Sequence, residues 1–75
     1  MERIELSKEM PNASEFEQAV IGVVLLEREA YRKVDHLTEE CFYVRAHQLV
    51  WRAIQELAKK GKPLDILMVT QQLLT

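Results

Sequence analysis

The side chains that could carry chemistry in this sequence are two histidines, one cysteine and two clusters of charge. His36 and His47 could ligate a metal, but they stand eleven residues apart, without an acidic or cysteine partner at ligand spacing. Cys41 could act as a nucleophile if a nearby base or cation stabilised its thiolate, and no base is adjacent in the sequence. We therefore expect no metal site and predict that Cys41 is a partly buried structural thiol.

One of the two charged clusters is acidic and the other is basic. The acidic cluster consists of Asp35, Glu39 and Glu40, and the basic cluster consists of Lys59, Lys60 and Lys62. Carboxylates act as general acids or bases where a pocket shifts their pKa, and the acidic cluster is predicted to form a solvated turn instead. The lysines are predicted to complement the negative end of a helix. A phosphate or partner contact is the alternative for the basic cluster.

The sequence contains no glycine-rich motif that would bind a nucleotide. A phosphate-binding loop needs Gly-x-x-x-x-Gly-Lys-[Ser/Thr], and the chain has only Gly22 and Gly61. Without a nucleophile–base pair, a metal set or a phosphate loop, a small enzyme is a distant alternative. We predict that the chain is not an enzyme and binds no cofactor. Its net charge of −2 argues against a dedicated nucleic-acid binder, whose affinity rests on neutralising phosphates.

Length and composition predict one small globular domain. The 75 residues are 48% apolar, and the single cysteine excludes an internal disulfide and fits a reducing cytosol. The run from 19 to 26 is too short to span a membrane, and the start lacks the pattern of a signal peptide. We therefore expect a cytoplasmic protein with a loose leader over residues 1–10 and a helical domain over residues 11–75.

Four helical segments are predicted, with no strand. The clearest has apolar residues at helical spacing throughout, at Ala46, Leu49, Val50, Ala53, Ile54, Leu57 and Ala58. Gly61 is predicted to end it in the left-handed conformation, and Asp65 to cap the next helix. That last amphipathic pattern has no stop signal before Thr75, so we expect a sequence cut from something longer.

The first two helices are predicted at about residues 14–27 and 28–37. Ser14 and Glu17 fit a capping box, and Asn12 is a rival cap. The first helix is apolar nearly all round, which is typical of a helix covered on more than one side. Gly22 in its middle predicts the close approach of another backbone, since glycine weakens a helix.

Core and partner residues follow from these faces. The predicted core consists of Val20, Val24, Leu49, Ala53, Ile54 and Leu57. The predicted partner surface consists of Tyr43, Arg45, Trp51 and Arg52, together with Ile21 and Leu25 on other faces of the first helix. For Trp51 and Tyr43, packing at the core or its rim is the default interpretation. An interface anchor is the alternative, because aromatic residues are enriched at binding hot spots.

Several motifs occur in a fixed order. After Pro11 comes Glu17-Gln18-Ala19-Val20-Ile21-Gly22, then Phe42-Tyr43 with Ala46-His47, then an Ile-x-x-Leu helix and Gly61-Lys62-Pro63-Leu64-Asp65. Over residues 11–74 this order resembles the N-terminal domain of DnaB-type replicative DNA helicases. Cys41 stands where that family usually has an acid, and Val44-Arg45 replaces a common Arg-Pro.

The resemblance implies an all-α fold, a small orthogonal bundle of four to five short helices that forms the head of that domain. In the family, a helical hairpin follows the head, and a motor domain that uses ATP and Mg²⁺ lies further downstream. The N-terminal domains pair and form a collar of three dimers on a hexameric ring. The collar docks the C-terminal helicase-binding domain of primase in the primosome and affects the action of the helicase loader.

The implied role is therefore assembly and recruitment in bacterial or phage DNA replication, with self-association and little direct DNA binding. The apolar faces of the first helix agree, because they exceed what so small a bundle can cover. The alternative is a small helix-turn-helix-like DNA-binding or adaptor module. It is suggested by basic and amide side chains on the outer side of the third helix, which are Arg45, Gln48, Arg52, Gln55 and Lys59.

Overall fold

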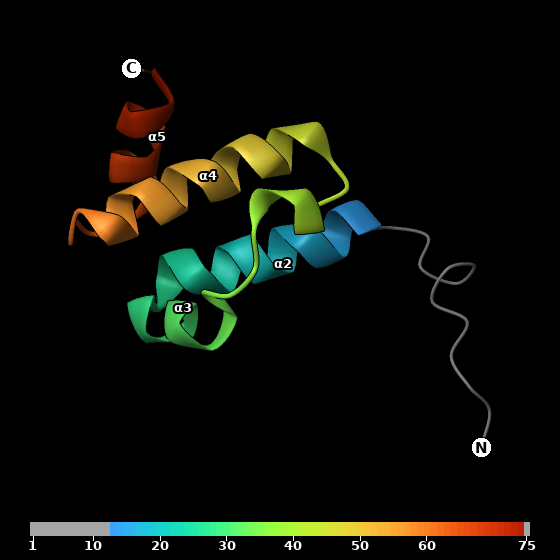
Figure 1. The fold of residues 1–75 in the computed structure, drawn as a ribbon, viewed down its shortest axis with the longest axis horizontal. Helices are drawn as coiled ribbons and strands as arrows, with labels where there is room; N and C mark the ends of the chain where they lie inside the picture. Colours follow the sequence, from blue (N-terminus) through green and yellow to red (C-terminus); the bar gives the residue numbers. More distant parts are fainter. Residues whose placement is uncertain (1–12, 75) are drawn as a thin grey trace.

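The structure, a computed structural model, describes residues 13–74 (Figure 1). It contains α2 (Ala13–Leu26), α3 (Arg28–Val34), the 3-10 helix η1 (Glu39–Cys41), α4 (Arg45–Lys59) and α5 (Ile66–Leu74). The described range has no strand, so the prediction of an all-α bundle is confirmed. The predicted leader over residues 1–10, the break at Pro11 and the rival cap Asn12 lie outside the described residues.

The helix α4 is the centre of the arrangement. It contacts α2, η1 and α5, whereas α3 folds back against α2 after a break at Glu27 (Figure 1). The helix α5 crosses the C-terminal end of α4. One side of α2 therefore faces α4, the adjacent side faces α3, and the remaining side has no neighbouring helix among the described residues.

The start of α2 differs from its prediction. The helix begins at Ala13, so Ser14 lies inside the first turn and the predicted capping box is wrong. The reason is that the Glu17 carboxylate binds the segment before α4 instead of the start of its own helix. No described part of this chain makes the close backbone approach predicted at Gly22, because a Cβ built there meets no atom within 4 Å.

The end of α3 also differs from its prediction. The helix stops at Val34 instead of about Leu37, and residues 35–36 form a turn. The carbonyl of Leu37 accepts hydrogen bonds from Trp51 Nε1–H at 2.9 Å and from Gln55 Nε2–H at 2.8 Å. Because both donors belong to α4, tertiary contacts take the place of a further helical turn here.

The junction between α4 and α5 matches its prediction. Gly61 has a φ of +69°, the left-handed conformation that glycine adopts most easily. The N–H of Lys62 donates to the carbonyl of Leu57 at 2.9 Å, and the N–H of Gly61 donates to that of Ala58 at 3.0 Å. This is a Schellman motif. Asp65 Oδ1 accepts the N–H of Met68 at 2.8 Å, which confirms the predicted cap of α5.

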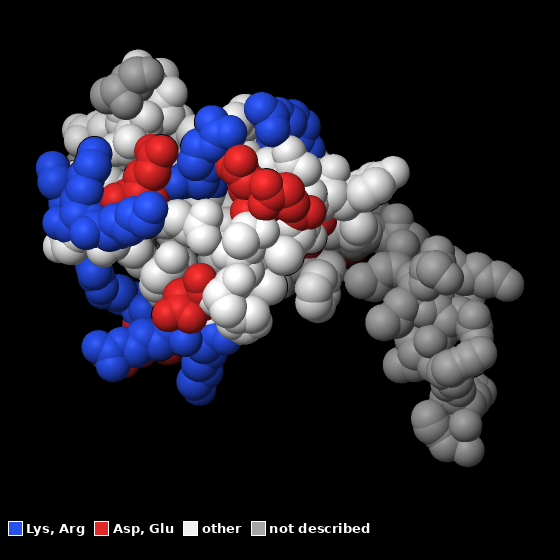
Figure 2. Space-filling model, viewed as in Figure 1, with Lys and Arg blue, Asp and Glu red and all other residues white. Residues whose placement is uncertain are grey.

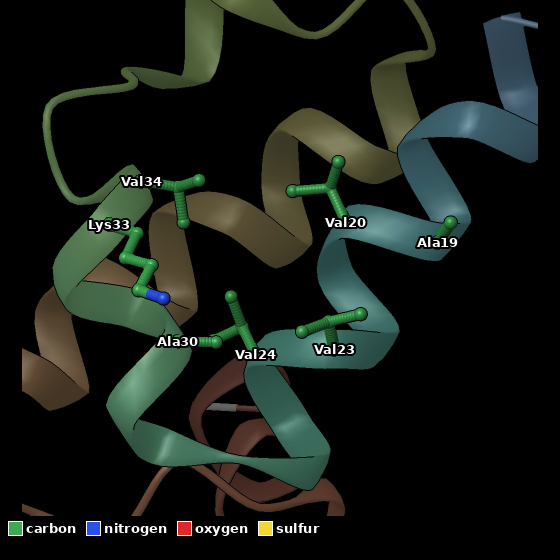
Figure 3. Close-up of a pocket in the computed structure, with 7 residues that line it drawn as sticks. All are labelled: Ala19, Val20, Val23, Val24, Ala30, Lys33 and Val34. Atoms are coloured by element: carbon green, nitrogen blue, oxygen red, sulfur yellow. The ribbon is translucent and has the colours of Figure 1, made fainter.

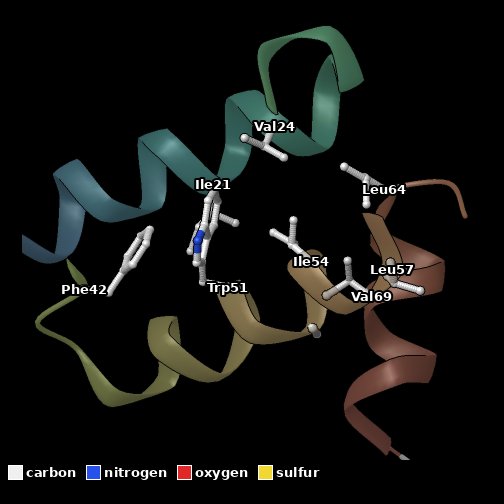
Figure 4. Packing of buried hydrophobic residues seen from close by; sticks show 9 residues of the cluster. Ile21, Val24, Phe42, Trp51, Ile54, Leu57, Leu64 and Val69 are labelled. Carbon is white, nitrogen blue, oxygen red and sulfur yellow. The ribbon is translucent and has the colours of Figure 1, made fainter. Parts of the chain in front are cut away.

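The hydrophobic core lies between α2, α4 and the start of α5 (Figure 4). Its buried residues are Ile21, Val24, Phe42, Trp51, Ala53, Ile54, Leu57, Leu64 and Val69. Of the six residues predicted for the core, Val24, Ala53, Ile54 and Leu57 are buried, and Val20 packs against the cluster. The prediction for Leu49 needs correction. Its side chain is 38% exposed because it faces a groove between α4 and α5.

Trp51 and Ile21 need the opposite correction. Both were predicted as partner contacts, but Trp51 is 0% exposed and Ile21 is buried. The indole fills the centre of the bundle, and its ring centroid lies 5.0 Å from that of Phe42 and 5.8 Å from that of Tyr31. Its only polar atom, Nε1, is satisfied by Leu37, which makes this burial favourable. Leu25, also predicted as a partner contact, is partly buried against the core.

Candidate interaction site

The residues that could carry chemistry are dispersed or already engaged. Across residues 13–74 no three His, Cys, Asp or Glu side chains gather in a way that could hold a metal ion. Cys41 is exposed at the end of η1, so its predicted partial burial is wrong, and its Sγ lies 3.8 Å from Thr38 Oγ1. No helix within the same range is long and apolar enough to cross a membrane. The candidate sites are therefore surfaces.

Glu17 is the buried polar centre of the domain. It is 7% exposed and lies on the side of α2 that faces α4. Its carboxylate accepts the backbone N–H groups of Tyr43 and Val44, the latter at 3.2 Å, and the Nδ1–H of His47 at 2.8 Å. Val44 is the N-cap of α4 and has no cap from its own side chain. Glu17 thus supplies, from another helix, an acceptor for two backbone N–H groups at and just before the N-cap of α4.

The environment of Glu17 keeps it ionised. Burial alone raises its pKa, but the hydrogen bonds from Tyr43, His47 and Val44 outweigh burial and hold the pKa below its ordinary value of 4.5. The sequence signal for this role was a carboxylate on the same helical face as Ile21 and Val24. Such a residue needs a buried partner, and the capping-box interpretation concealed that need.

Tyr43 projects from the segment that Glu17 holds. Phe42 is buried against Trp51, while the next residue, Tyr43, is 84% exposed. The Gln48 amide donates to the Phe42 carbonyl at 2.7 Å, which fixes this segment from the α4 side. An exposed aromatic side chain on a fixed backbone loses little conformational entropy on binding, so Tyr43 is suited to anchor a partner.

Arg52 and Arg45 lie on the same side of α4, two turns apart. Arg52 forms an ion pair with Glu39 of η1 at 2.8 Å from Nε and 3.1 Å from Nη2. The hydrogen bond from Arg52 is the main cause of a lowered Glu39 pKa, and the charge of Arg45 contributes to it. One member of the acidic cluster is thus paired instead of only solvated. Figure 2 shows acidic and basic side chains side by side where Figure 1 places η1 and α4.

Three of the predicted partner residues are exposed, Tyr43 just before α4 and Arg45 and Arg52 on one side of that helix. We call Tyr43, Arg45 and Arg52 the Tyr43–Arg52 surface. The Nη1 of Arg45 donates to Gln48 Oε1 at 2.9 Å, and half of the Arg52 side chain remains exposed beside its ion pair. This surface combines an aromatic ring with two guanidinium groups, which is the composition expected of a contact for an acidic or mixed partner.

A second surface lies on the far side of α2. Four exposed apolar side chains follow each other at spacings of three, four and three residues, and we call them the α2 stripe. They are Phe16, Ala19, Val23 and Leu26. The exposed fractions of Phe16, Val23 and Leu26 are 59%, 50% and 86%. Stretches of apolar surface like this commonly mark interaction sites on soluble proteins.

The α2 stripe continues into a groove between α2 and α3. The groove has a volume of about 300 Å³. It is lined by Ala19, Val20, Val23, Val24, Ala30, Val34 and the aliphatic part of Lys33, which project towards each other in Figure 3. Lys33 is the only charged residue in this lining. The stripe and the groove together form one apolar face with a cation at its rim.

The basic cluster lies at the turn between α4 and α5, next to the start of α3. Lys59 is in the last turn of α4, as expected for a cation that complements the helix terminus. Lys60 and Lys62 line a shallow groove with Leu57, Met68, Gln71 and Gln72. The carbonyl of Lys62 accepts a hydrogen bond from Arg28 Nη1 at 2.8 Å, which ties the start of α3 to the α4–α5 turn.

Comparison with known proteins gives a consistent result. Residues 9–75 match the family described as the DnaB-like helicase N terminal domain. Over 64 residues the chain is 45% identical to the replicative DNA helicase DnaB of Rhodothermus marinus and 39% identical to that of Geobacillus stearothermophilus. It is 31% identical over 72 residues to the replicative DNA helicase DnaB of Buchnera aphidicola subsp. Baizongia pistaciae.

These matches cover most of this chain but only a small part of each relative. The match covers 84% of this chain and 7% of the Rhodothermus protein, 84% and 14% for the Geobacillus protein, and 95% and 16% for the Buchnera protein. The chain therefore spans less than a fifth of the length of these relatives. No solved structure gives a significant match.

Proposed function

Because the chain belongs to the DnaB-like helicase N-terminal domain family, we propose that it is a non-catalytic assembly and recruitment domain of a replicative DNA helicase. Helicase activity, with its ATP and Mg²⁺, belongs in this proposal to a motor domain elsewhere in the longer protein. The domain would act in the cytoplasm of a bacterium or of a phage-infected cell.

The observation that carries the proposal is the apolar face of α2. Phe16, Val23 and Leu26 are exposed although they are large apolar residues at helical spacing. A monomer gains nothing from such a face, whereas a subunit of an assembly can bury it. We infer that the domain associates with other copies, as a dimer and within the hexameric collar of the longer protein.

Recruitment is proposed to use the Tyr43–Arg52 surface. Its partner is the C-terminal helicase-binding domain of primase, and the helicase loader is a further candidate. Tyr43 supplies an exposed anchor, and Arg52 can exchange its exposed ion pair with Glu39 for an acidic group of the partner. Ion pairs at exposed positions are weak, so this exchange costs little.

The recruitment proposal is tested with the variant Arg52→Glu. It should weaken binding of the primase domain in isothermal titration calorimetry by at least about tenfold, because Arg is a common hot-spot residue. Arg32→Glu, an exposed substitution on α3, is the matched control and should bind like the wild type. Circular dichroism should show the same helix content in all three proteins. Equal binding by Arg52→Glu would contradict the assignment of this surface.

The DNA-binding alternative finds less support in the structure. Its recognition helix would be α4, but two amides on that side, Gln48 and Gln55, donate to the carbonyls of Phe42 and Leu37. Arg52 is paired with Glu39. Side chains that are engaged within the domain are not free to contact base edges. We therefore propose little direct DNA binding.

A further inference from the structure

We propose that Glu17 and His47 are positioning residues for the exposed ring of Tyr43, and that recruitment of a protein partner depends on them although both are largely buried. This inference rests on the proposed recruitment function and deepens it. It places control of the Tyr43–Arg52 surface partly on α2, a helix that contributes no residue to that surface.

The segment between η1 and α4, residues 42–44, is short and lacks regular structure of its own. Its backbone is extended at Phe42 and at Val44. The N–H groups of Tyr43 and Val44 donate to the carboxylate of Glu17 on α2. Hydrogen bonds to a charged acceptor are stronger than those between neutral groups. A side chain 26 positions earlier in the sequence therefore fixes the backbone that carries the Tyr43 ring.

His47 orients the carboxylate of Glu17. Oε2 of Glu17 accepts the N–H of Tyr43, and Oε1 accepts the N–H of Val44 at 3.2 Å. Oε1 also lies 2.8 Å from Nδ1 of His47, which is in the first turn of α4. Because a carboxylate is planar, holding one oxygen at His47 restricts where the other oxygen can lie at Tyr43. We call these two side chains the Glu17–His47 clamp.

The neighbours of Tyr43 direct its ring towards solvent. Phe42 is 4% exposed, and its ring centroid lies 5.0 Å from that of Trp51. The Gln48 amide donates to the carbonyl of Phe42 at 2.7 Å. Successive side chains of an extended segment point to opposite sides, so the burial of Phe42 turns Tyr43 outwards. The Glu17–His47 clamp then holds the peptide groups on either side of Tyr43.

The clamp reduces the conformational freedom that a partner has to remove. A side chain on a mobile backbone loses entropy when it is immobilised in an interface, and this loss weakens binding. With the N–H groups of Tyr43 and Val44 held, much of this ordering is complete before the partner arrives. Removing Glu17 or His47 leaves the Tyr43 ring present but frees its backbone. The clamp should therefore affect affinity through Tyr43.

The test is isothermal titration calorimetry of the 75-residue protein with the C-terminal helicase-binding domain of primase. Glu17→Gln and His47→Ala should each raise the dissociation constant about tenfold. His47→Ala keeps the carboxylate, so it is the variant to use if Glu17→Gln is partly unfolded. Wild-type affinity in a variant that circular dichroism shows to be folded would overturn the inference.

A double variant separates positioning from an independent effect on binding. If the clamp acts through Tyr43, Glu17→Gln has no further effect once the ring is absent. The double variant of Glu17→Gln and Tyr43→Ala should then bind as weakly as Tyr43→Ala alone. If the two losses of affinity multiply instead, the effects are independent and the inference falls.

The matched control for a loss of stability is Val69→Ala. Val69 is 4% exposed and lies on α5, which crosses the C-terminal end of α4. The substitution removes buried methyl groups, so it destabilises the domain at a place remote from Phe42 (Figure 4). It should bind the primase domain like the wild type. A loss of affinity as large as that of Glu17→Gln would show that stability, and not positioning, governs binding.

Amide hydrogen exchange followed by NMR gives a readout that needs no partner. In the wild type the N–H groups of Tyr43 and Val44 should exchange slowly, because Glu17 holds both. In Glu17→Gln and in His47→Ala these two groups should exchange faster, while amides in the middle of α4 stay protected. Unchanged protection of Tyr43 and Val44 in both variants would overturn the clamp.

The failure of this inference can be told apart from that of the proposed function. If the wild type binds the primase domain and the folded clamp variants bind it equally well, the positioning role is wrong and recruitment stands. If the wild type does not bind the primase domain, recruitment of primase and the positioning role both fall.

Discussion

Replacing Glu17 by glutamine removes the buried charge that joins α2 to the start of α4. The substitution keeps the size of the side chain and one carbonyl oxygen, but it introduces an NH₂ group where a carboxylate oxygen accepted hydrogen bonds. Three donors converge on Glu17, namely the N–H groups of Tyr43 and Val44 and the Nδ1–H of His47. A glutamine cannot accept all three.

The size of the effect follows from these contacts. Hydrogen bonds to a charged group contribute about 1.5–3 kcal/mol, and a buried donor left without an acceptor costs about 1–3 kcal/mol. One orphaned donor and the loss of charge at the others give a destabilisation of about 2–4 kcal/mol, allowing for non-additivity. That is a large fraction of the about 5–15 kcal/mol that stabilises a typical domain.

The assay is chemical unfolding followed by circular dichroism at several pH values. The folded state holds the pKa of Glu17 below 4.5, so the folded state binds this proton less readily than the unfolded state does. The stabilisation from Glu17 is therefore fully present above the unfolded pKa and is lost as the pH falls through the folded pKa. The difference between wild type and Glu17→Gln should be largest at neutral pH and should shrink below pH 4.5.

The control is Glu40→Gln, which neutralises an exposed carboxylate in η1. It should change the free energy of unfolding by less than about 0.5 kcal/mol, as surface substitutions usually do. The reasoning is refuted if Glu17→Gln is as stable as Glu40→Gln at neutral pH. It is also refuted if the destabilisation of Glu17→Gln is the same above and below pH 4.5.

Three further substitutions test the packing and the helix ends by the same unfolding assay. Leu57→Ala should cost about 2–5 kcal/mol, because Leu57 is 1% exposed in the centre of the core, and a cost below about 1 kcal/mol would contradict its core role. Gly22→Ala should stabilise the monomer by up to about 1 kcal/mol, because a Cβ there has open space, and destabilisation would show that the site is occupied. Asp65→Ala should cost about 1 kcal/mol through the lost cap on Met68, whereas Asp65→Asn, which can still cap, should retain most of the stability.

The local sequence was sufficient for the parts of the fold that depend on neighbouring residues. The period of apolar residues in α4, the left-handed Gly61 and the cap at Asp65 all depend on neighbours within a few positions. These features need no knowledge of the rest of the chain, because the hydrogen bonds that fix them are closed within one turn.

The parts that were missed depend on contacts between distant residues. Glu17 and His47 are thirty positions apart, and only the fold brings their side chains within 2.8 Å. Trp51 was placed at the edge of its helix by periodicity, but the Leu37 carbonyl lets the indole be buried. Leu49 fits the apolar stripe of α4 equally well, yet the described part of α5 leaves it 38% exposed. The periodicity of apolar residues indicates which face of a helix is apolar, but it does not indicate which other segment covers that face.

The candidate surfaces also have features that could be predicted from neighbouring residues and features that depend on contacts between distant residues. Tyr43, Arg45 and Arg52 could be grouped from the sequence, because they lie on or next to one helix. The ion pair of Arg52 with Glu39 could not be predicted, because it depends on where η1 packs against α4. The surplus apolar surface of α2 was predictable from its composition. The side of α2 that remains uncovered became visible only when α3 and α4 were placed.

Self-association is the central claim, and sedimentation equilibrium of the wild-type chain from micromolar to millimolar concentration tests it most directly. The account predicts a mass that rises reversibly with concentration from the 8.8 kDa of the monomer towards that of a dimer. A single species of 8.8 kDa at every concentration would contradict it.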